Sequence, residues 1–226
     1  MDKQNLKYEN KEICKKCGGY CCKKSGCDYF VSDFESMKLD YLEKVLNTGR
    51  VSIIASFDFK RLSNGKLVYT PILSLRARNN NRDIIDLLSL KTRCASLEEN
   101  GCHYDINKRP GGGSSLIPKE NKQCYSEINK IEELKKWIPY QKILERLVKR
   151  YTKMSVTEKI KEDVENLIYN VLSENFEEVL PEEIIDIKRM IPLLEECFPE
   201  EFLQAIIRYK NNNSKVPLRT KKKQKI

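Results

Sequence analysis

Residues 14–22 read Cys14-Lys15-Lys16-Cys17-Gly18-Gly19-Tyr20-Cys21-Cys22, and this segment decides how the first half of the chain folds. A two-residue spacing lets two thiolates converge on one metal ion through a tight turn. The two glycines allow backbone conformations that other residues resist, so the segment can wrap around an ion. The neighbouring lysines favour the thiolate form that binds metals. We therefore expect the segment to contribute ligands to a metal centre.

The remaining cysteines extend this cluster to a second, distant segment. The chain has nine cysteines in all. In a reducing compartment, clustered thiols are more often metal ligands than structural disulfides. A disulfide framework and unliganded buried thiols are the two alternatives. The sequence predicts zinc, iron or an iron–sulfur cluster as the bound group, with the ligands Cys14, Cys17, Cys21, Cys22, Cys94, Cys102 and Cys124.

The sequence does not decide the roles of several residues near these thiols. Cys21 and Cys22 are adjacent, and neighbouring side chains diverge, so the pair faces two ions, bridges them, or includes one thiol that is not a ligand. Cys27 and His103 are further candidate ligands, although consecutive residues such as Cys102 and His103 rarely reach one ion. Arg109 either screens thiolate charge, binds an anion or is an ordinary surface arginine. Cys197 lies in a helical pattern and is interpreted as a core or boundary residue.

The two cysteine segments together resemble a known family. The head Cys14-x2-Cys17-x3-Cys21-Cys22 and the later Cys94-x2-Leu97…Gly101-Cys102, followed by Arg109-Pro110, are similar to the YkgJ-type family of zinc- or iron-chelating cysteine clusters. Flagellin lysine N-methylases carry a similar cluster. The resemblance covers roughly residues 12–126 and implies metal binding more than any particular reaction. The chain departs from the family after Arg-Pro, where a cysteine is replaced by residues 111–118, so Cys124 would supply that ligand through a longer loop.

Charge and hydropathy restrict the remaining function classes. The net charge is +9, but residues 210–226 hold seven Lys or Arg and no acid, which leaves +2 for residues 1–209. This basic tail is either a solvated, disordered terminus or a segment that binds nucleic acid or anionic lipid. No segment approaches the ~20 apolar residues needed to cross a bilayer. The polar N-terminus lacks the apolar middle of a signal peptide, and we expect a cytoplasmic protein.

Local patterns predict the elements around the cysteines. Ser32-Asp33-Phe34-Glu35 is typical of a capping box and predicts a helix over 33–47. Two β-branched and aromatic segments, 51–62 and 66–77, are joined by Ser63-Asn64-Gly65, which indicates a hairpin that lets the two cysteine segments meet. Residues 100–124 are expected to be loop, with the triple glycine 111–113 as a flexible lid or linker.

Helices are predicted for most of the second half of the chain. Apolar spacing indicates one helix over about 128–137 and another that starts or kinks at Pro139. Further helices are expected over 156–175, 182–196 and 199–210, with Pro181 and Pro199 in first-turn positions. The predicted fold is α+β and mostly helical. A cysteine-rich metal-binding module with one β-hairpin (1–126) is followed by a helical layer packed on it (127–210) and a disordered basic tail (211–226).

The sequence leaves two classes of function in contention. The first is a metal-binding protein, with a metal ion as its ligand and an unidentified protein as a further partner. The second is a cluster-dependent enzyme, such as a lysine N-methylase-like or redox protein. The chain has no glycine-rich turn after a strand to hold S-adenosylmethionine, no Cys-x3-Cys-x2-Cys spacing and no zinc-finger spacing. These absences argue against a conventional methyltransferase, a radical enzyme and a DNA-binding finger respectively.

Overall fold

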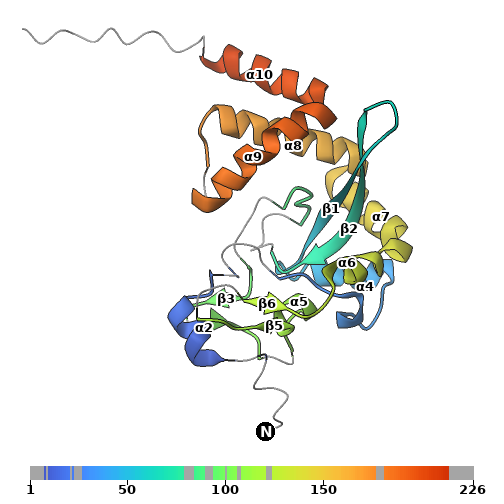
Figure 1. The fold of residues 1–226 in the computed structure, drawn as a ribbon. Coiled ribbons are helices and arrows are strands. Elements are labelled where there is room, and N and C mark those ends of the chain that lie inside the picture. Colours follow the sequence, from blue (N-terminus) through green and yellow to red (C-terminus); the bar gives the residue numbers. More distant parts are fainter. Residues whose placement is uncertain are drawn as a thin grey trace, which may run out of the picture.

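The structure is a computed structural model of the chain. It describes residues 8, 10–20, 22, 27–78, 84–89, 94–99, 101–105, 108–120, 124–176 and 181–213. The fold is α+β, as predicted, and is mostly helical with a long β-hairpin (Figure 1). The helices are α2 (Lys11–Cys17), α4 (Leu39–Leu46), α5 (Gly111–Ser114), α6 (Lys130–Lys135), α7 (Gln141–Thr152), α8 (Val156–Leu172), α9 (Pro181–Cys197) and α10 (Pro199–Asn213).

The strands form two-stranded antiparallel sheets. The hairpin has the register Ser52↔Arg76 at its base and Arg61↔Leu67 at its tip. Two very short pairs lie among the cysteine segments. The strands are β1 (Ser52–Arg61), β2 (Leu67–Arg76), β3 (Leu97–Glu98), β4 (Gly101–Cys102), β5 (Leu116–Ile117) and β6 (Tyr125–Ser126).

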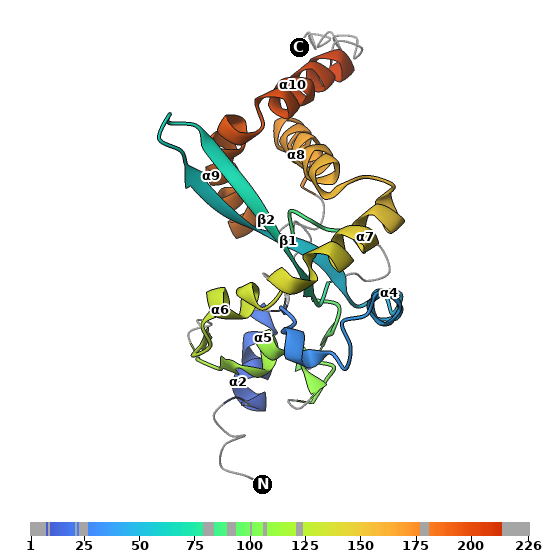
Figure 2. The same cartoon turned by 90° about the vertical axis from the view of Figure 1, so that its right-hand side faces the viewer.

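The hairpin joins the two ends of the molecule. The short elements that carry cysteines gather near the N-terminus, α8, α9 and α10 gather at the opposite end, and the hairpin extends from the first group towards the second (Figures 1 and 2). Its turn contains Gly65 with φ +84°, a conformation that favours glycine. At the tip, the Arg61 guanidinium pairs with the Glu196 carboxylate of α9 at 2.5 and 3.0 Å. The predicted hairpin is therefore confirmed.

The main hydrophobic core lies between the base of the hairpin and the helices. Leu42 and Leu46 of α4 are fully buried against hairpin residues such as Leu75, and α7 and α8 contribute residues such as Leu144 and Ile160. The Gln141 side chain links α7 to β2, because its amide accepts from the Leu73 N–H at 2.8 Å and donates to the Leu73 carbonyl at 2.9 Å. The buried apolar stripes on these helices are core packing, as expected from the sequence.

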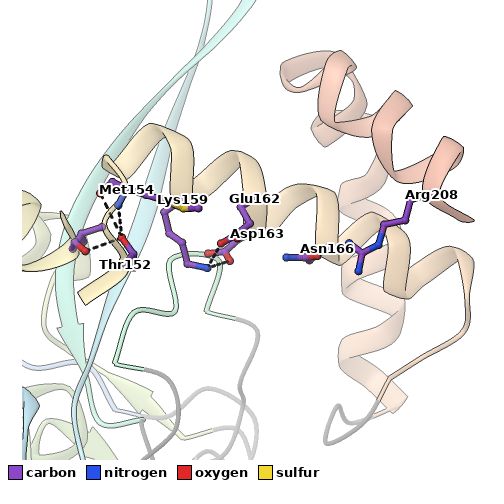
Figure 3. Close-up of polar contacts among 8 residues, drawn as sticks. Thr152, Met154, Lys159, Glu162, Asp163, Asn166 and Arg208 are labelled. Carbon is purple, nitrogen blue, oxygen red and sulfur yellow. Dashed lines mark hydrogen bonds and ion pairs between the residues drawn. The ribbon is translucent and has the colours of Figure 1, made fainter. Parts of the chain in front are cut away.

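The helices of the second half follow the predicted pattern closely. α8 starts at a capping box in which the Ser155 hydroxyl accepts from the Glu158 N–H at 3.2 Å and the Glu158 carboxylate accepts from the Ser155 N–H at 2.7 Å. Its polar face carries Lys159, whose ammonium donates to the Glu162 and Asp163 carboxylates (Figure 3). Pro181 and Pro199 are the first residues of α9 and α10, as predicted. α10 continues to Asn213, three residues beyond the expected end, and the rest of the basic tail lies outside the described residues.

The helix predicted over 33–47 differs from the structure. Residues Val31–Asp33 form a 3-10 turn, and the α-helix begins only at Leu39 after the cap residue Lys38. The predicted capping box of Ser32 and Glu35 does not start a helix there, and the neighbouring Asp33 carboxylate accepts from the Phe30 N–H and from the Gly111 N–H, each at 2.7 Å. Asp33, which the local pattern placed at the start of the helix, thus bonds to a residue 78 positions away.

Candidate metal centre

Seven cysteines line one cavity of about 490 Å³. Six of them are predicted ligands, and the seventh, Cys27, was left open by the sequence. The remaining predicted ligand, Cys21, lies outside the described residues. The head and the 94–124 segment therefore meet at one place, as the hairpin model requires. The cysteines of this thiol cavity are Cys14, Cys17, Cys22, Cys27, Cys94, Cys102 and Cys124.

Helix α2 places Cys14 and Cys17 on the cavity wall. The Asn10 side chain caps the helix by accepting from the Ile13 N–H at 2.9 Å. The helix ends at Gly18, whose φ of 65° is left-handed and whose N–H donates to the Cys14 carbonyl. Residues three apart share one helix face, so both thiols face the same side.

Ala77, the residue that follows β2, anchors both cysteine segments through backbone hydrogen bonds. The Ala77 N–H donates to the Cys27 carbonyl at 2.8 Å, and the Ala77 carbonyl accepts from the Ala95 N–H at 3.1 Å. The Cys94 N–H donates to the Cys22 carbonyl at 2.6 Å, which joins the two cysteine segments directly. Ala77 and Cys94 form a small buried cluster with Leu97, separate from the main core. The strand thus sets the relative position of the thiols.

The triple glycine 111–113 corrects the sequence interpretation. It does not form a flexible loop, because it makes the short helix α5 and packs closely on residues 27–30. A methyl group on Gly111 would overlap the Phe30 ring, and one on Gly113 would overlap the Cys27 sulfur. The glycines therefore permit a close approach that brings Cys27 to the cavity. Because β4, α5 and β5 lie within 100–124, the prediction of a continuous loop there was also wrong.

Burial and nearby polar groups determine the pKa of one thiol of the cavity, that of Cys102. Burial raises the pKa of the Cys102 thiol, while the Tyr104 backbone and the Arg109 guanidinium limit that rise. Arg109 also donates to the Tyr104 carbonyl at 3.0 Å, and it lines the cavity. Of the roles that the sequence left open for Arg109, screening of thiolate charge fits this position best.

Ser96 is a functional candidate that the sequence did not indicate. Its N–H donates to the Cys94 sulfur at 3.5 Å, and its carbonyl accepts from the His103 N–H at 2.7 Å. Its hydroxyl oxygen is buried in the cavity wall and has no hydrogen-bond partner among the described residues. A buried hydroxyl without a partner costs free energy, so a bound group in the cavity would satisfy it. No sequence motif marks this serine.

His103, a candidate ligand from the sequence, and Cys197, interpreted there as a core or boundary residue, both lie apart from the cavity. His103 does not line it, and the His103 Nδ1 atom contacts the Glu98 carboxylate at 2.6 Å instead. Cys197 packs at the edge of the main core at the end of α9, which agrees with its interpretation as a boundary residue. Burial raises the pKa of the Cys197 thiol. Cys197 is thus a natural control for experiments on the cavity thiols.

The cysteine side chains line the cavity wall, but they do not converge on one point. Within the part of the chain that the structure describes, no group of three Cys, His, Asp or Glu side chains has the arrangement of a metal site. No disulfide joins two of the described cysteines. Tetrahedral zinc needs four ligand atoms at ~2.0–2.3 Å, so thiols spread around about 490 Å³ must move inwards to bind one ion or must share a larger centre.

Comparisons with protein-family models, with curated proteins and with solved structures give no match for this chain. Among the described helices, none combines the length and the apolar character that a membrane span requires.

Proposed function

We propose that the thiol cavity holds a thiolate-ligated metal centre, either zinc, iron or an iron–sulfur cluster, and that the chain is a metal-binding protein. The observation that carries the proposal is the convergence of seven cysteines from distant segments on one cavity. The YkgJ-type resemblance of the two cysteine segments points to the same chemistry, and we propose the chain as a divergent relative of that family. Cys21, which belongs to the same motif, completes the proposed ligand set.

The residues of the cavity fit such a centre in three respects. Thiolates are the ligands that zinc, iron and iron–sulfur clusters share. The buried Ser96 hydroxyl and the Ser96 N–H on the Cys94 sulfur supply hydrogen-bond donors of the kind that orient metal ligands. Gly113 leaves space for the Cys27 sulfur where any larger residue would displace it. A metal centre would also explain why so many thiols gather at one end of the molecule, since structural zinc contributes ~10–16 kcal/mol to folding.

Metal analysis of protein purified without oxygen tests the proposal. We expect a stoichiometric metal content, with visible charge-transfer absorption and labile sulfide for an iron–sulfur cluster, or a colourless protein for zinc. Cys17→Ser and Cys102→Ser should lower the metal content, because each removes a thiol from the cavity. Cys197→Ser is the matched control and should retain all the metal, since Cys197 lies outside the cavity. A metal content unchanged by the first two variants, or lost equally in the control, would refute the proposal.

A steric variant tests the cavity while keeping every thiol. Gly113→Ala introduces a methyl group against the Cys27 sulfur, so it should lower metal occupancy. Ser114→Ala in the same short helix is the control, because it removes only the Ser114 hydroxyl bond to the Gly111 carbonyl. Full occupancy in Gly113→Ala would remove Cys27 from the proposed ligands.

A further inference from the structure

A second cavity, of about 430 Å³, adjoins the thiol cavity and shares Cys27, Leu116 and Cys124 with it. Its volume lies within the ~300–1,000 Å³ range of small-molecule sites. Its wall carries three cationic side chains, Arg76, Arg78 and Lys130, and one carboxylate, Asp28. We call it the arginine cavity. The excess of positive charge on its wall favours an anion.

Arg78 is unusually buried for a cation. Only 2% of its side chain is exposed, and it forms an ion pair with the Asp86 carboxylate at 3.8 Å. The Arg78 Nη1 atom donates to the Ser89 carbonyl at 2.6 Å and also contacts the Ser89 hydroxyl. The Arg78 guanidinium is thus held in the cavity wall by contacts with Ser89 and Asp86.

Ser89 has a strained backbone conformation and contacts both arginines. Its φ of 54° is left-handed, which non-glycine residues seldom adopt. Its hydroxyl accepts from the Arg76 Nη1 atom at 2.5 Å as well as from Arg78. Strain of this kind is concentrated at ligand-binding and active sites. Here Ser89 contacts two cations, from the last residue of β2 and from just beyond it, at one cavity wall.

Two cationic groups remain available to a ligand. Arg76 uses its Nε atom for the Asp28 carboxylate at 2.5 Å and its Nη1 atom for Ser89, while its Nη2 atom makes no hydrogen bond with a described residue. Lys130 is exposed and forms no ion pair within the described ranges. A guanidinium edge and an ammonium group are the donors that carboxylates and phosphates prefer.

The rest of the lining is partly apolar, because Phe30, Leu116 and Ile128 contribute to the wall. We propose that the arginine cavity binds a small organic anion, whose carboxylate or phosphate group contacts Arg76 and Lys130 and whose apolar part contacts Phe30, Leu116 and Ile128. The site would place that molecule next to Cys27 and Cys124. It rests on the charges and shape of this cavity and does not require a metal in the thiol cavity.

Calorimetric titration of the full chain with three matched probes tests the site. Phenyl phosphate and benzoate share an aromatic ring and differ in the anionic group, and benzyl alcohol is the uncharged control. We expect one of the anions to bind at least about tenfold more tightly than benzyl alcohol, because charge-assisted hydrogen bonds are stronger than those of a neutral hydroxyl. The tighter of the two anions identifies the preferred group.

Variants locate the binding to this cavity. Arg76→Gln should weaken anion binding about tenfold or more, and Lys130→Gln about threefold because Lys130 is exposed. Lys135→Gln on the same helix is the matched control and should bind as the unmodified chain does, since Lys135 pairs with Glu132 outside the cavity. Lys130 makes no described ion pair, so its variant stays folded and remains informative if Arg76→Gln does not. Equal affinity for all three probes, or unchanged anion affinity in both cavity variants, would overturn the proposal.

Discussion

Folding buries most of the Asp163 side chain. It lies on α8 and accepts from the Lys159 ammonium at 2.7 Å, as Figure 3 shows. Burial raises the pKa of Asp163 from 3.8 to about 6, and the nearby charges of Asp86 and Glu162 add to the rise, while Lys159 opposes it. The folded protein therefore binds a proton between about pH 4 and pH 6 that the unfolded chain does not.

This pKa gives a testable pH dependence. Because the folded state binds more protons in that window, the contribution of Asp163 to stability falls as the pH rises from about 4 to 6 and is constant above it. A rise from 3.8 to about 6 corresponds to ~3 kcal/mol. Asp163→Asn should flatten this part of the stability profile in urea unfolding. Glu162→Gln, which removes the more exposed partner of Lys159, should keep most of the slope, because burial and not Glu162 is the largest cause of the raised pKa. An unchanged slope in Asp163→Asn would contradict the assignment.

His103 and Cys27 show what residue type alone can predict. Both were candidate ligands because imidazole and thiolate bind the same metals. The structure places Cys27 on the thiol cavity and His103 beside Glu98. Spacing argued only against His103, which directly follows Cys102. The place of Cys27 depends on Gly113, which is far from it in the sequence.

At the scale of elements, helices α2 and α8 begin with similar caps but have different surroundings. Asn10 caps α2, which carries two thiols of the cavity and has only partly buried apolar residues. Ser155 caps α8, whose Ile160, Val164 and Ile168 belong to the main core. The stability of α8 is thus tied to the whole fold, whereas that of α2 is tied to the cysteine end.

The two caps make a matched pair of variants. Removing an N-cap side chain costs ~1 kcal/mol. Ser155→Ala should lower the global free energy of unfolding by about that amount and leave the metal content unchanged. Asn10→Ala should lower metal affinity and change the global value little. Denaturant unfolding and metal titration on both variants check this, and the reverse pattern would show that α2 and α8 belong to one cooperative unit.

At the scale of the whole molecule, the buried apolar residues are divided unevenly between the two ends. The main core joins the hairpin base to α4 and α7–α10, while the cysteine end has a small buried cluster around Ala77, Cys94 and Leu97. A cluster of that size stabilises little by itself. The proposed metal centre would therefore supply much of the stability of the cysteine end.

Removing the metal should open one end of the molecule and not the other. On chelation, amide hydrogen exchange should rise in α2 and around Cys94–Cys102, since these segments lose their shared ligand. Amides of α7 and α8 should stay protected by the main core. Chelator treatment of Cys17→Ser provides the control and should change exchange far less. Uniform exchange across both ends would indicate that the metal stabilises the entire fold.

Local sequence determined much of the second half of this fold. The periods of apolar residues and the prolines at helix starts predicted α8, α9 and α10, and Asn64-Gly65 predicted the hairpin turn. These features depend on neighbours within a few residues, so a pattern read along the chain contains the information. The predicted division at residue 126 remains a prediction, although the main core includes residues from both sides of it.

The sequence by itself determined that thiols are abundant and clustered, that a hairpin separates their two groups, and that helices follow. Only the tertiary structure decided that Asp33 contacts Gly111 and does not start an α-helix, that the glycine triplet packs on residues 27–30, and that Ala77 holds both cysteine segments. The physical reason is that these contacts join residues far apart in the sequence. A glycine permits a mobile loop and a tight contact equally well, and the surface that distant residues bring against it decides between them.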